Sequence, residues 1–580
     1  MNPYSDSRFI GFITMVSPLL TKVHFPSSIL LKKFYNADDG FHAITGKYII
    51  IEGSGSGFLG KITEIALPEK ERLELTESKF DKEVFHPTGK VEILLCFDNY
   101  KLKAKKGLDQ LPPVSAKVYL CTDNFLGTLL TDFGTKENTK PTTIPLATLP
   151  SNENHKIDVS AQALFGRHCA VVGTTGGGKS WTVAKLIEEV ANSNGKAILI
   201  DATGEYETLK SDEIEYLKFN DLSKYGIYFN YKRLKETDLS ALFRPSQQSQ
   251  LPKLQEAMKS LRLIEIINSK KLTEGDSDAK LKAATFITNS EHNYVTLKKS
   301  GVDKDLNYIA SCKNNPSVYS NNCDFDIKAL GPQIIKECIY ETGTEDKTAK
   351  NNCFSLISRI LLTTNDRSFS KVFDFKNEND KSCPNEFELV FNKFIEGNSK
   401  VLILSVAEVS TENKLKEILV NSIGRFLLEK ALEKEFKKND INEDRDKKSL
   451  LLFLDEAHLF LNKRIKDEYS IEVELDAFDR IAKECRKFGL FLVISTQMPR
   501  DIPRGVLSQM GTFIVHRLIN QQDREAIEFA CSDANKSALS FLPILSSGEA
   551  MLTGVDFPMP MILKITKPNV EPDSNTPSVF

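Results

Sequence analysis

The chain has 580 residues, of which 41% are hydrophobic and 27% charged, so its composition excludes a disordered or fibrous protein. A chain of this length holds about two to four domains of ordinary size. Its formal net charge of -3 at pH 7 excludes a general electrostatic attraction to nucleic acid, so any contact with DNA must come from a local basic patch.

Residues 1–150 carry the pattern of a small β-rich domain. Short strand-like runs are broken by Gly, Pro and Asn-Asp clusters, and no strongly periodic helix separates them. Residues 55–62 approach the spacing of a phosphate-binding loop, but Ile62 offers no hydroxyl and the next residues alternate like a strand, which favours a tight hairpin. We expect a small β-barrel or sandwich built from the runs 9–16, 47–53, 60–68, 91–97 and 116–121.

From about Phe165 the pattern changes to strands followed by amphipathic helices, one of which runs from Ser180 to near Gly195. The strand-length runs are almost continuously apolar, as in parallel strands that are buried on both faces. An α/β fold with a core of parallel strands is therefore predicted, and the strands are 169–173, 196–203, 400–407, 449–456, 489–496 and 511–518.

A long stretch interrupts this alternation between the second and third core strands. It is rich in Lys, Asn and Ser and contains helical segments, so we interpret it as a mainly helical insertion. The predicted divisions are an N-terminal β-barrel at 1–150, the α/β core at 160–207 and 396–565, the insertion at 208–395, and a C-terminal extension at 566–580.

The strongest motif is GTTGGGKS at residues 173–180, which matches G-x-x-x-x-G-K-[ST] between a predicted strand and a predicted helix. Its glycines let backbone N–H groups curl around phosphates at a helix N-terminus, with a glycine-rich turn that binds no nucleotide as the alternative. Lys179 can reach the β- and γ-phosphates, and Ser180 offers a hydroxyl to Mg²⁺. The predicted ATP contacts are Gly173, Thr174, Thr175, Gly176, Gly177, Gly178, Lys179, Ser180 and Trp181.

The second signature is LLLFLDE at residues 450–456, a buried strand that delivers two carboxylates to its C-terminal end. Asp455 would hold Mg²⁺, and Glu456 would polarise the attacking water. Gln497 ends the next predicted strand, where a neutral amide can contact the γ-phosphate or the water; a polar strand cap is the alternative.

These motifs together resemble the HerA/FtsK class of motor ATPases, and the HerA family in particular. The resemblance implies that the α/β part is a RecA-like P-loop NTPase core. The resemblance covers roughly residues 1–205 and 398–580, weakly in the barrel and strongly in the core. The blocks that carry it stand in family order: GTTGGGKS, DATGEY at 201–206, LLLFLDEAH at 450–458, IAKECRKFGL at 481–490, STQMPRDIP at 495–503 and SGEAMLTG at 547–554.

The resemblance implies roles for further residues. Arg486 matches the arginine expected to reach the nucleotide of a neighbouring subunit, with a solvated helix arginine as the alternative, and Arg167 matches a second arginine near the phosphates. Asp201 and Glu205 match acids in the block after the second strand and are expected at the nucleotide.

The chain departs from the family pattern at two positions. Cys485 stands where the family usually has glycine, and Met498 stands where it usually has arginine. Both departures lie beside predicted site residues, one next to the arginine finger and the other next to the sensor amide.

Beyond ATP, the resemblance implies a homohexameric ring that translocates on double-stranded DNA. It also implies a separate effector, such as a NurA-type nuclease or a sirtuin-like NADase, in DNA end processing or anti-phage defence. Two alternatives stay open: an ATP-switched scaffold that activates a bound effector enzyme, and a secretion or conjugation ATPase. Basic residues in a predicted loop are candidates for DNA contact: Lys463, Arg464 and Lys466.

Features of location point to the cytoplasm. The ten cysteines form no C-x-x-C pair, which argues against a zinc ribbon or redox dithiol and fits a reducing compartment. We expect no signal peptide in the first residues, and no apolar run approaches the length of a membrane-spanning helix.

Overall fold

The computed structural model divides into two compact units, Met1–Ser193 with Phe491–Phe580, and Asn194–Leu490. We call them the first and the second unit and describe each by itself. The described residues are all except 1, 18–19, 27–44, 69–85, 101–103, 106–109, 132–141, 151, 194, 273–275, 300–305, 341–342, 376–382, 435, 437–448, 462, 466–472, 532–535, 556, 558 and 575–580.

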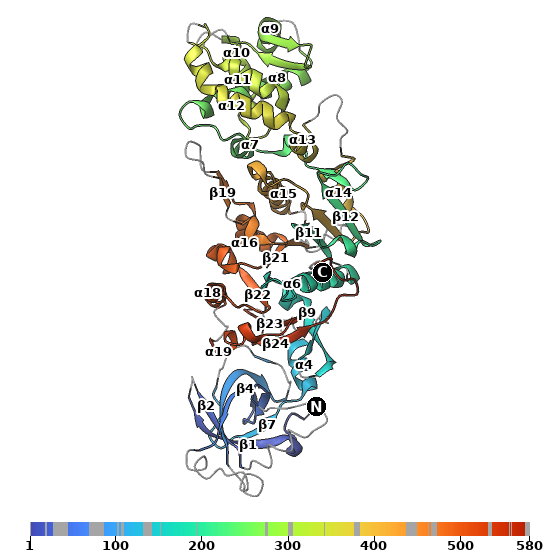
Figure 1. Ribbon diagram of the computed structural model, residues 1–580, viewed down its shortest axis with the longest axis vertical. Coiled ribbons are helices and arrows are strands. Elements are labelled where there is room, and N and C mark those ends of the chain that lie inside the picture. Colours follow the sequence, from blue (N-terminus) through green and yellow to red (C-terminus); the bar gives the residue numbers. More distant parts are fainter. Residues whose placement is uncertain are drawn as a thin grey trace, which may run out of the picture. The chain divides into compact units, whose positions relative to one another are not determined.

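The first unit begins with a closed, antiparallel β-barrel of six strands, which confirms the predicted barrel (Figure 1). The strand order is β2-β1-β7-β3-β4-β5, and pairing of β2 with β5 closes it, while the short β6 (Ala104–Lys105) adds to β5. The barrel strands are β1 (Phe9–Val16), β2 (Thr21–His24), β3 (Tyr48–Ile51), β4 (Ser56–Ala66), β5 (Thr88–Asp98) and β7 (Lys117–Leu120).

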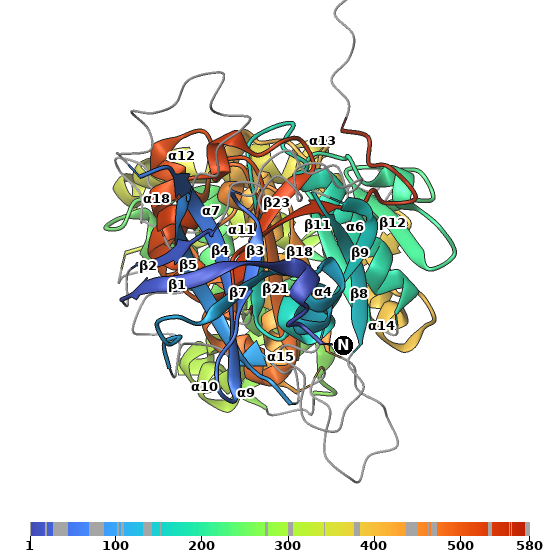
Figure 2. The ribbon, with the colours of Figure 1, turned by 90° about the horizontal axis from the view of Figure 1, so that it is seen from below.

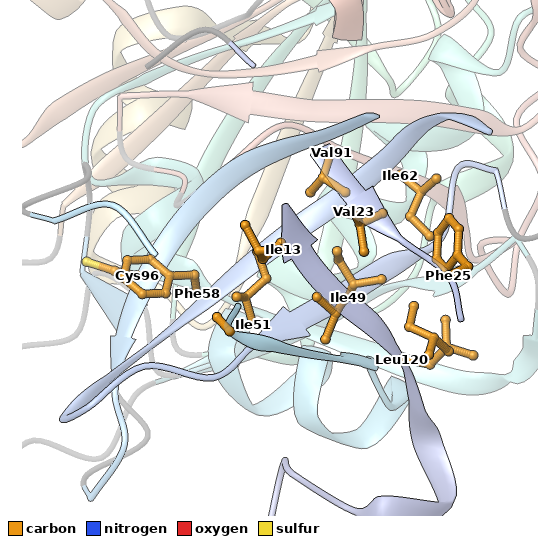
Figure 3. Packing of buried hydrophobic residues seen from close by; sticks show 13 residues of the cluster. Ile13, Val23, Phe25, Ile49, Ile51, Phe58, Ile62, Val91, Cys96 and Leu120 are labelled. Carbon is orange, nitrogen blue, oxygen red and sulfur yellow. The ribbon is translucent and has the colours of Figure 1, made fainter. Parts of the chain in front are cut away.

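Side chains from every closing strand fill the barrel. Figure 3 shows Ile13, Val23, Ile49 and Val91 converging in this core, where each of them is at most 2% exposed. Ile62 is buried with them, and β3 and β4 pair as a hairpin joined by residues 52–55, so the hairpin predicted at this pseudo-P-loop is confirmed.

The core sheet of the first unit combines parallel and antiparallel strands. β21 (Leu490–Thr496), β10 (His168–Val172) and β22 (Met510–Val515) are parallel, with β10 in the middle. The sheet continues antiparallel through β23 (Glu549–Gly554), β24 (Met561–Ile565), β8 (Thr143–Leu149) and β9 (Asn152–Ser160). Its helices are α4 (Asp123–Thr131), α5 (Ala161–Phe165), α6 (Lys179–Asn192), α17 (Arg504–Leu507), α18 (Gln521–Ala530) and α19 (Lys536–Leu539).

The sheet of the second unit is parallel in the order β16-β13-β12-β17-β11-β18. β11 (Lys196–Asp201), β17 (Val401–Ser405) and β18 (Leu450–Leu454) were predicted, and every residue in them is buried. β12 (Ile214–Phe219), β13 (Gly226–Tyr228) and β16 (Asn385–Glu386) were not. Helices α14 (Phe387–Glu396), α15 (Leu415–Leu432) and α16 (Ala477–Glu484) complete this part.

The remainder of the second unit is a mainly helical insertion, as expected (Figure 2). Within it, α11 packs against α8 and α12, and a small hairpin of β14 (Phe286–Asn289) and β15 (Tyr294–Leu297) packs on α8 and α11. Its helices are α7 (Glu236–Phe243), α8 (Gln250–Ser269), α9 (Ser277–Thr285), α10 (Leu306–Asn314), α11 (Leu330–Glu337), α12 (Lys347–Asn365) and α13 (Arg367–Phe373). Among the described residues, no helix has the length and apolar character that crossing a bilayer requires.

Candidate nucleotide site

The glycine-rich loop of the first unit joins β10 to α6, the context in which the motif binds phosphate. Gly176 has φ +72° and Gly178, the N-cap of α6, has φ +112°. Residues other than glycine rarely adopt such backbone angles. Helix α6 then begins at Lys179, so the N–H groups of its first turn and the positive end of its dipole face the loop.

Neighbouring strand ends hold the loop in place. The N–H of Gly173 donates to the carbonyl of Thr496 at 3.3 Å, and that of Thr174 donates to Arg517 O at 3.0 Å. On the other side, Gly548 N–H donates to the carbonyl of Gly177 at 3.3 Å. The cradle is therefore built from β10, β21, β22 and the turn before β23.

The polar side chains of the loop fit a triphosphate with Mg²⁺. Lys179 is 7% exposed, and its Nζ lies 3.4 Å from the carbonyl oxygen of Thr174 within the loop. Ser180 is half-buried on the first turn of α6. A buried ammonium beside glycine amides and a helix N-terminus forms a site for negative charge, and the serine hydroxyl is a ligand that Mg²⁺ accepts.

Gln497 directly follows β21 and contacts the loop. The hydroxyl of Thr175 donates to Gln497 Oε1 at 2.5 Å. The structure therefore brings this predicted residue to the predicted phosphate loop, where its amide can respond to what the loop binds.

His516, which was not predicted from the sequence, packs against the glycines of the loop. It directly follows β22 and is fully buried. Its Nδ1 donates to the carbonyl of Glu549 at 2.9 Å, and its Nε2 lies 2.8 Å from the hydroxyl of Thr182 on α6. A Cβ added at Gly173 would lie 2.6 Å from His516 Cβ, so only glycine allows the loop to approach this histidine.

Burial lowers the pKa of His516 to about 4, and the nearby charge of Lys179 acts in the same direction. The imidazole is therefore neutral near pH 7. A carbonyl can only accept, so the ring hydrogen is on Nδ1 and Nε2 accepts from Thr182. The sequence gives only a weak signal for this role of His516, which is a single histidine after an apolar strand.

The predicted carboxylates lie in the second unit, directly after β18. Asp455 is 5% exposed, and the hydroxyl of Thr203 donates to its Oδ2 at 3.4 Å. Glu456 is 8% exposed and lies with φ 43° in the left-handed region, which is uncommon for a residue with a side chain. Its Oε2 is 3.2 Å from His458 Nδ1. Such backbone strain is concentrated at functional sites.

Asp201 has a structural task in the second unit. Its carboxylate accepts the N–H groups of Thr203 at 3.2 Å, Gly204 at 2.7 Å and Tyr206 at 3.4 Å, and so shapes the loop after β11. Burial raises the pKa of Asp201, while these hydrogen bonds oppose that rise. Glu205, in the same loop, is half-buried.

Comparison with known proteins identifies the fold family. The model for the central domain of helicase HerA matches residues 144–427, and the model for the HerA-like C-terminal domain matches residues 426–566. The chain belongs to the HerA family. It is accordingly a P-loop ATPase of the helicase type with a RecA-like core.

Curated relatives agree with this assignment. A probable helicase of Methanocaldococcus jannaschii is 27% identical over 461 residues, which span 78% of this chain and 74% of the relative. The DNA double-strand break repair helicase HerA of Sulfolobus acidocaldarius is 24% identical, over 90% and 88% of the two chains.

Among solved structures, VirB4 of Thermoanaerobacter pseudethanolicus is 15% identical, with a TM-score of 0.40, over 75% of this chain and 98% of its own. The plasmid coupling protein TrwB in complex with ADP and Mg²⁺ is 12% identical, with a TM-score of 0.42, over 72% and 87%.

Two arginines of this HerA-family chain lie on short connections. Arg167 is half-buried between α5 and β10 in the first unit. Arg486 is exposed in the second unit, on a 3-10 turn (Cys485–Phe488) that continues α16. Ile481 and Cys485 are fully buried, so Arg486, which is exposed, projects away from the core of its own unit.

The basic segment after β18 differs from the predicted loop. Residues Lys463–Ile465 form β19, which pairs antiparallel with β20 (Val473–Leu475) in a two-stranded sheet. Lys463 and Arg464 therefore lie on a strand that pairs with β20, and Lys466 lies outside the described residues.

Proposed function

We propose that this chain is the subunit of a homohexameric ring that hydrolyses ATP and translocates on double-stranded DNA. One observation carries the proposal: a complete P-loop cradle, with Lys179 and Ser180 in place, in a chain of the HerA family. Relatives named as DNA double-strand break repair helicases support DNA as the substrate.

Each site residue has a defined task in this proposal. The loop amides and Lys179 bind the triphosphate, while Ser180 and Asp455 would hold Mg²⁺, which would neutralise charge on the phosphates. Glu456 orients and polarises the attacking water, for which its buried carboxylate after β18 is suited. Gln497, held by Thr175, reports the state of the γ-phosphate to β21.

Hydrolysis is assigned to the ring rather than to one subunit. The exposed guanidinium of Arg486 stabilises charge on the γ-phosphate of a neighbouring subunit, and Arg167 contributes a second positive charge near the phosphates. Asp201 keeps the loop that carries Glu205 in position, through the hydrogen bonds described above.

The motor works with a separate effector in the cytoplasm. We propose an enzyme of the NurA-type nuclease or sirtuin-like NADase class, acting in DNA end processing or anti-phage defence. The motor supplies movement on DNA, and the effector supplies the chemistry on its own substrate.

ATP turnover with and without double-stranded DNA tests this function. A DNA motor couples hydrolysis to movement, so the wild type is expected to turn over ATP severalfold faster with DNA. Because contacts with phosphates release counterions, the stimulation falls as salt rises. Turnover that DNA does not change over a range of salt concentrations favours the ATP-switched scaffold instead. Lys179→Ala serves as the inactive control.

A further inference from the structure

The last described residues of the chain lie along the P-loop helix. After β24, residues 566–574, here the C-terminal strap, follow α6 within the first unit; in Figure 1 this is the red segment beside α6. Pro568 and Pro572 are buried while most of the strap is exposed. Proline has no N–H, so its burial leaves no donor unsatisfied.

A carboxylate on α6 anchors the strap. Asn569 donates twice to Glu188, from its backbone N–H to Oε2 at 2.6 Å and from Nδ2 to Oε1 at 3.0 Å. The buried ammonium of Lys185 also donates to Glu188 Oε1, at 2.8 Å. Glu188 is therefore held by α6 on one side and by the strap on the other.

The strap also contacts the residue after the P-loop motif. Lys567 Nζ lies 4.6 Å from the ring centroid of Trp181, within the range of a cation–π interaction. Trp181 follows Ser180 on the first turn of α6, is half-buried, and is the one tryptophan of the chain.

Backbone hydrogen bonds link the start of the strap to the P-loop itself. Ile565 N–H donates to the carbonyl of Gly548 at 2.9 Å, and Gly548 N–H donates to that of Gly177 at 3.3 Å. Two hydrogen bonds therefore connect Gly177 in the cradle, through Gly548, to Ile565, and the strap begins at the next residue. Trp181 is one residue beyond Ser180, so its side chain starts from the same turn of α6 that borders the cradle.

We propose that Trp181 and the C-terminal strap form the base-binding wall of the ATP site. The flat indole offers a stacking surface for a purine, and Lys567 together with the Asn569–Glu188 anchor fixes that surface beside the cradle. The proposal rests on the proposed ATPase function and adds a specificity-determining role for the C-terminal strap.

Comparing ATP with inorganic tripolyphosphate separates the wall from the cradle. Both ligands fill the phosphate loop, but only ATP has a base. By titration calorimetry on the full chain, Trp181→Ala is expected to weaken ATP binding about tenfold and Lys567→Ala about threefold. Trp181→Phe keeps a stacking ring and restores most of the loss. In the wild type, ATP changes the Trp181 fluorescence and tripolyphosphate does not.

Asp573→Ala is the matched control, because it removes an exposed charge of the strap that faces neither Trp181 nor Glu188 in the described contacts. Its ATP affinity is expected to equal that of the wild type. The proposed base-binding wall is wrong if Trp181→Ala leaves the ATP affinity unchanged. It is also wrong if Trp181→Ala weakens the binding of ATP and of tripolyphosphate equally. If the wild type binds neither ligand, the proposed ATPase site itself is wrong.

Discussion

The Nε2 atom of His516 lies 2.8 Å from the hydroxyl of Thr182, so that a buried neutral imidazole joins the end of β22 to the first turns of the P-loop helix. The second ring nitrogen, Nδ1, donates to the carbonyl of Glu549. The phosphate loop therefore rests on a hydrogen-bonded side chain rather than on apolar packing alone. Protonation of Nε2 would remove its acceptor and add a charge near Lys179.

The pH dependence of stability follows from this arrangement. The folded pKa of about 4 is below the ordinary value of about 6.5, so the unfolded chain binds more protons between these values. The stabilisation is complete above pH 6.5 and is lost as pH falls toward 4. At pH 5 the loss is on the order of 2 kcal/mol. Urea unfolding of the first unit at pH 7 and pH 5 is expected to show this loss in the wild type but not in His516→Gln; equal losses contradict it.

Two glycines of the loop offer a matched pair of substitutions. A Cβ at Gly178 would lie 3.2 Å from His516 Cε1 with φ at +112°, whereas at Gly176, with φ +72°, it meets no atom within 4 Å. Gly178→Ala is therefore expected to weaken ATP binding clearly more than Gly176→Ala, which bears the backbone strain alone. Calorimetric affinities of the two variants measure the difference. A larger effect of Gly176→Ala would show that the contact with His516 does not determine which substitutions the loop tolerates.

Lys179→Ala and Glu456→Ala are expected to separate binding from hydrolysis. Lys179 places a charge on the phosphates, so its loss weakens both ATP binding and turnover. Glu456 acts on the water, so its loss leaves ATP binding intact and slows hydrolysis by orders of magnitude. Affinity and single-turnover rate are measured for each variant. Near wild-type turnover in Glu456→Ala would remove this residue from its catalytic role.

Arg486 is expected to act on the neighbouring subunit, and mixed rings test this. Arg486→Ala and Lys179→Ala subunits are each expected to be inactive, with an effect of roughly 10³ for the arginine. In mixed rings, some interfaces pair an intact P-loop with an intact Arg486, so turnover should return. Mixed rings that form, as shown by a tag on one variant, but stay inactive would exclude this role.

The sequence predicted best those elements whose signal is local. The apolar runs of β11, β17 and β18 suit parallel strands buried on both faces, and GTTGGGKS specifies its own turn. By contrast, β12 and β13 are short strands inside a stretch rich in polar residues, and they pair with β17, with each other and with β16. Such pairing is decided by partners distant in the chain.

The same reasoning explains the omissions at the site. His516 contacts Thr182, which is 334 positions away in the sequence, so that no local pattern marks its role. The strand β19 depends on pairing with β20, which a local pattern in residues 463–465 does not show. For Arg486, the buried positions of Ile481 and Cys485 could be predicted from helical spacing, but the change from α16 to a 3-10 turn could not.

Displacement of a triplex-forming oligonucleotide from double-stranded DNA measures translocation without requiring strand separation. With ATP and Mg²⁺, the wild-type chain is expected to displace the third strand, at a rate that follows ATP turnover, and Glu456→Ala is expected to bind the DNA without displacing it. Displacement that is equally fast without ATP, or no displacement by a wild type whose ATP turnover is stimulated by the same DNA, would contradict a motor that moves on double-stranded DNA.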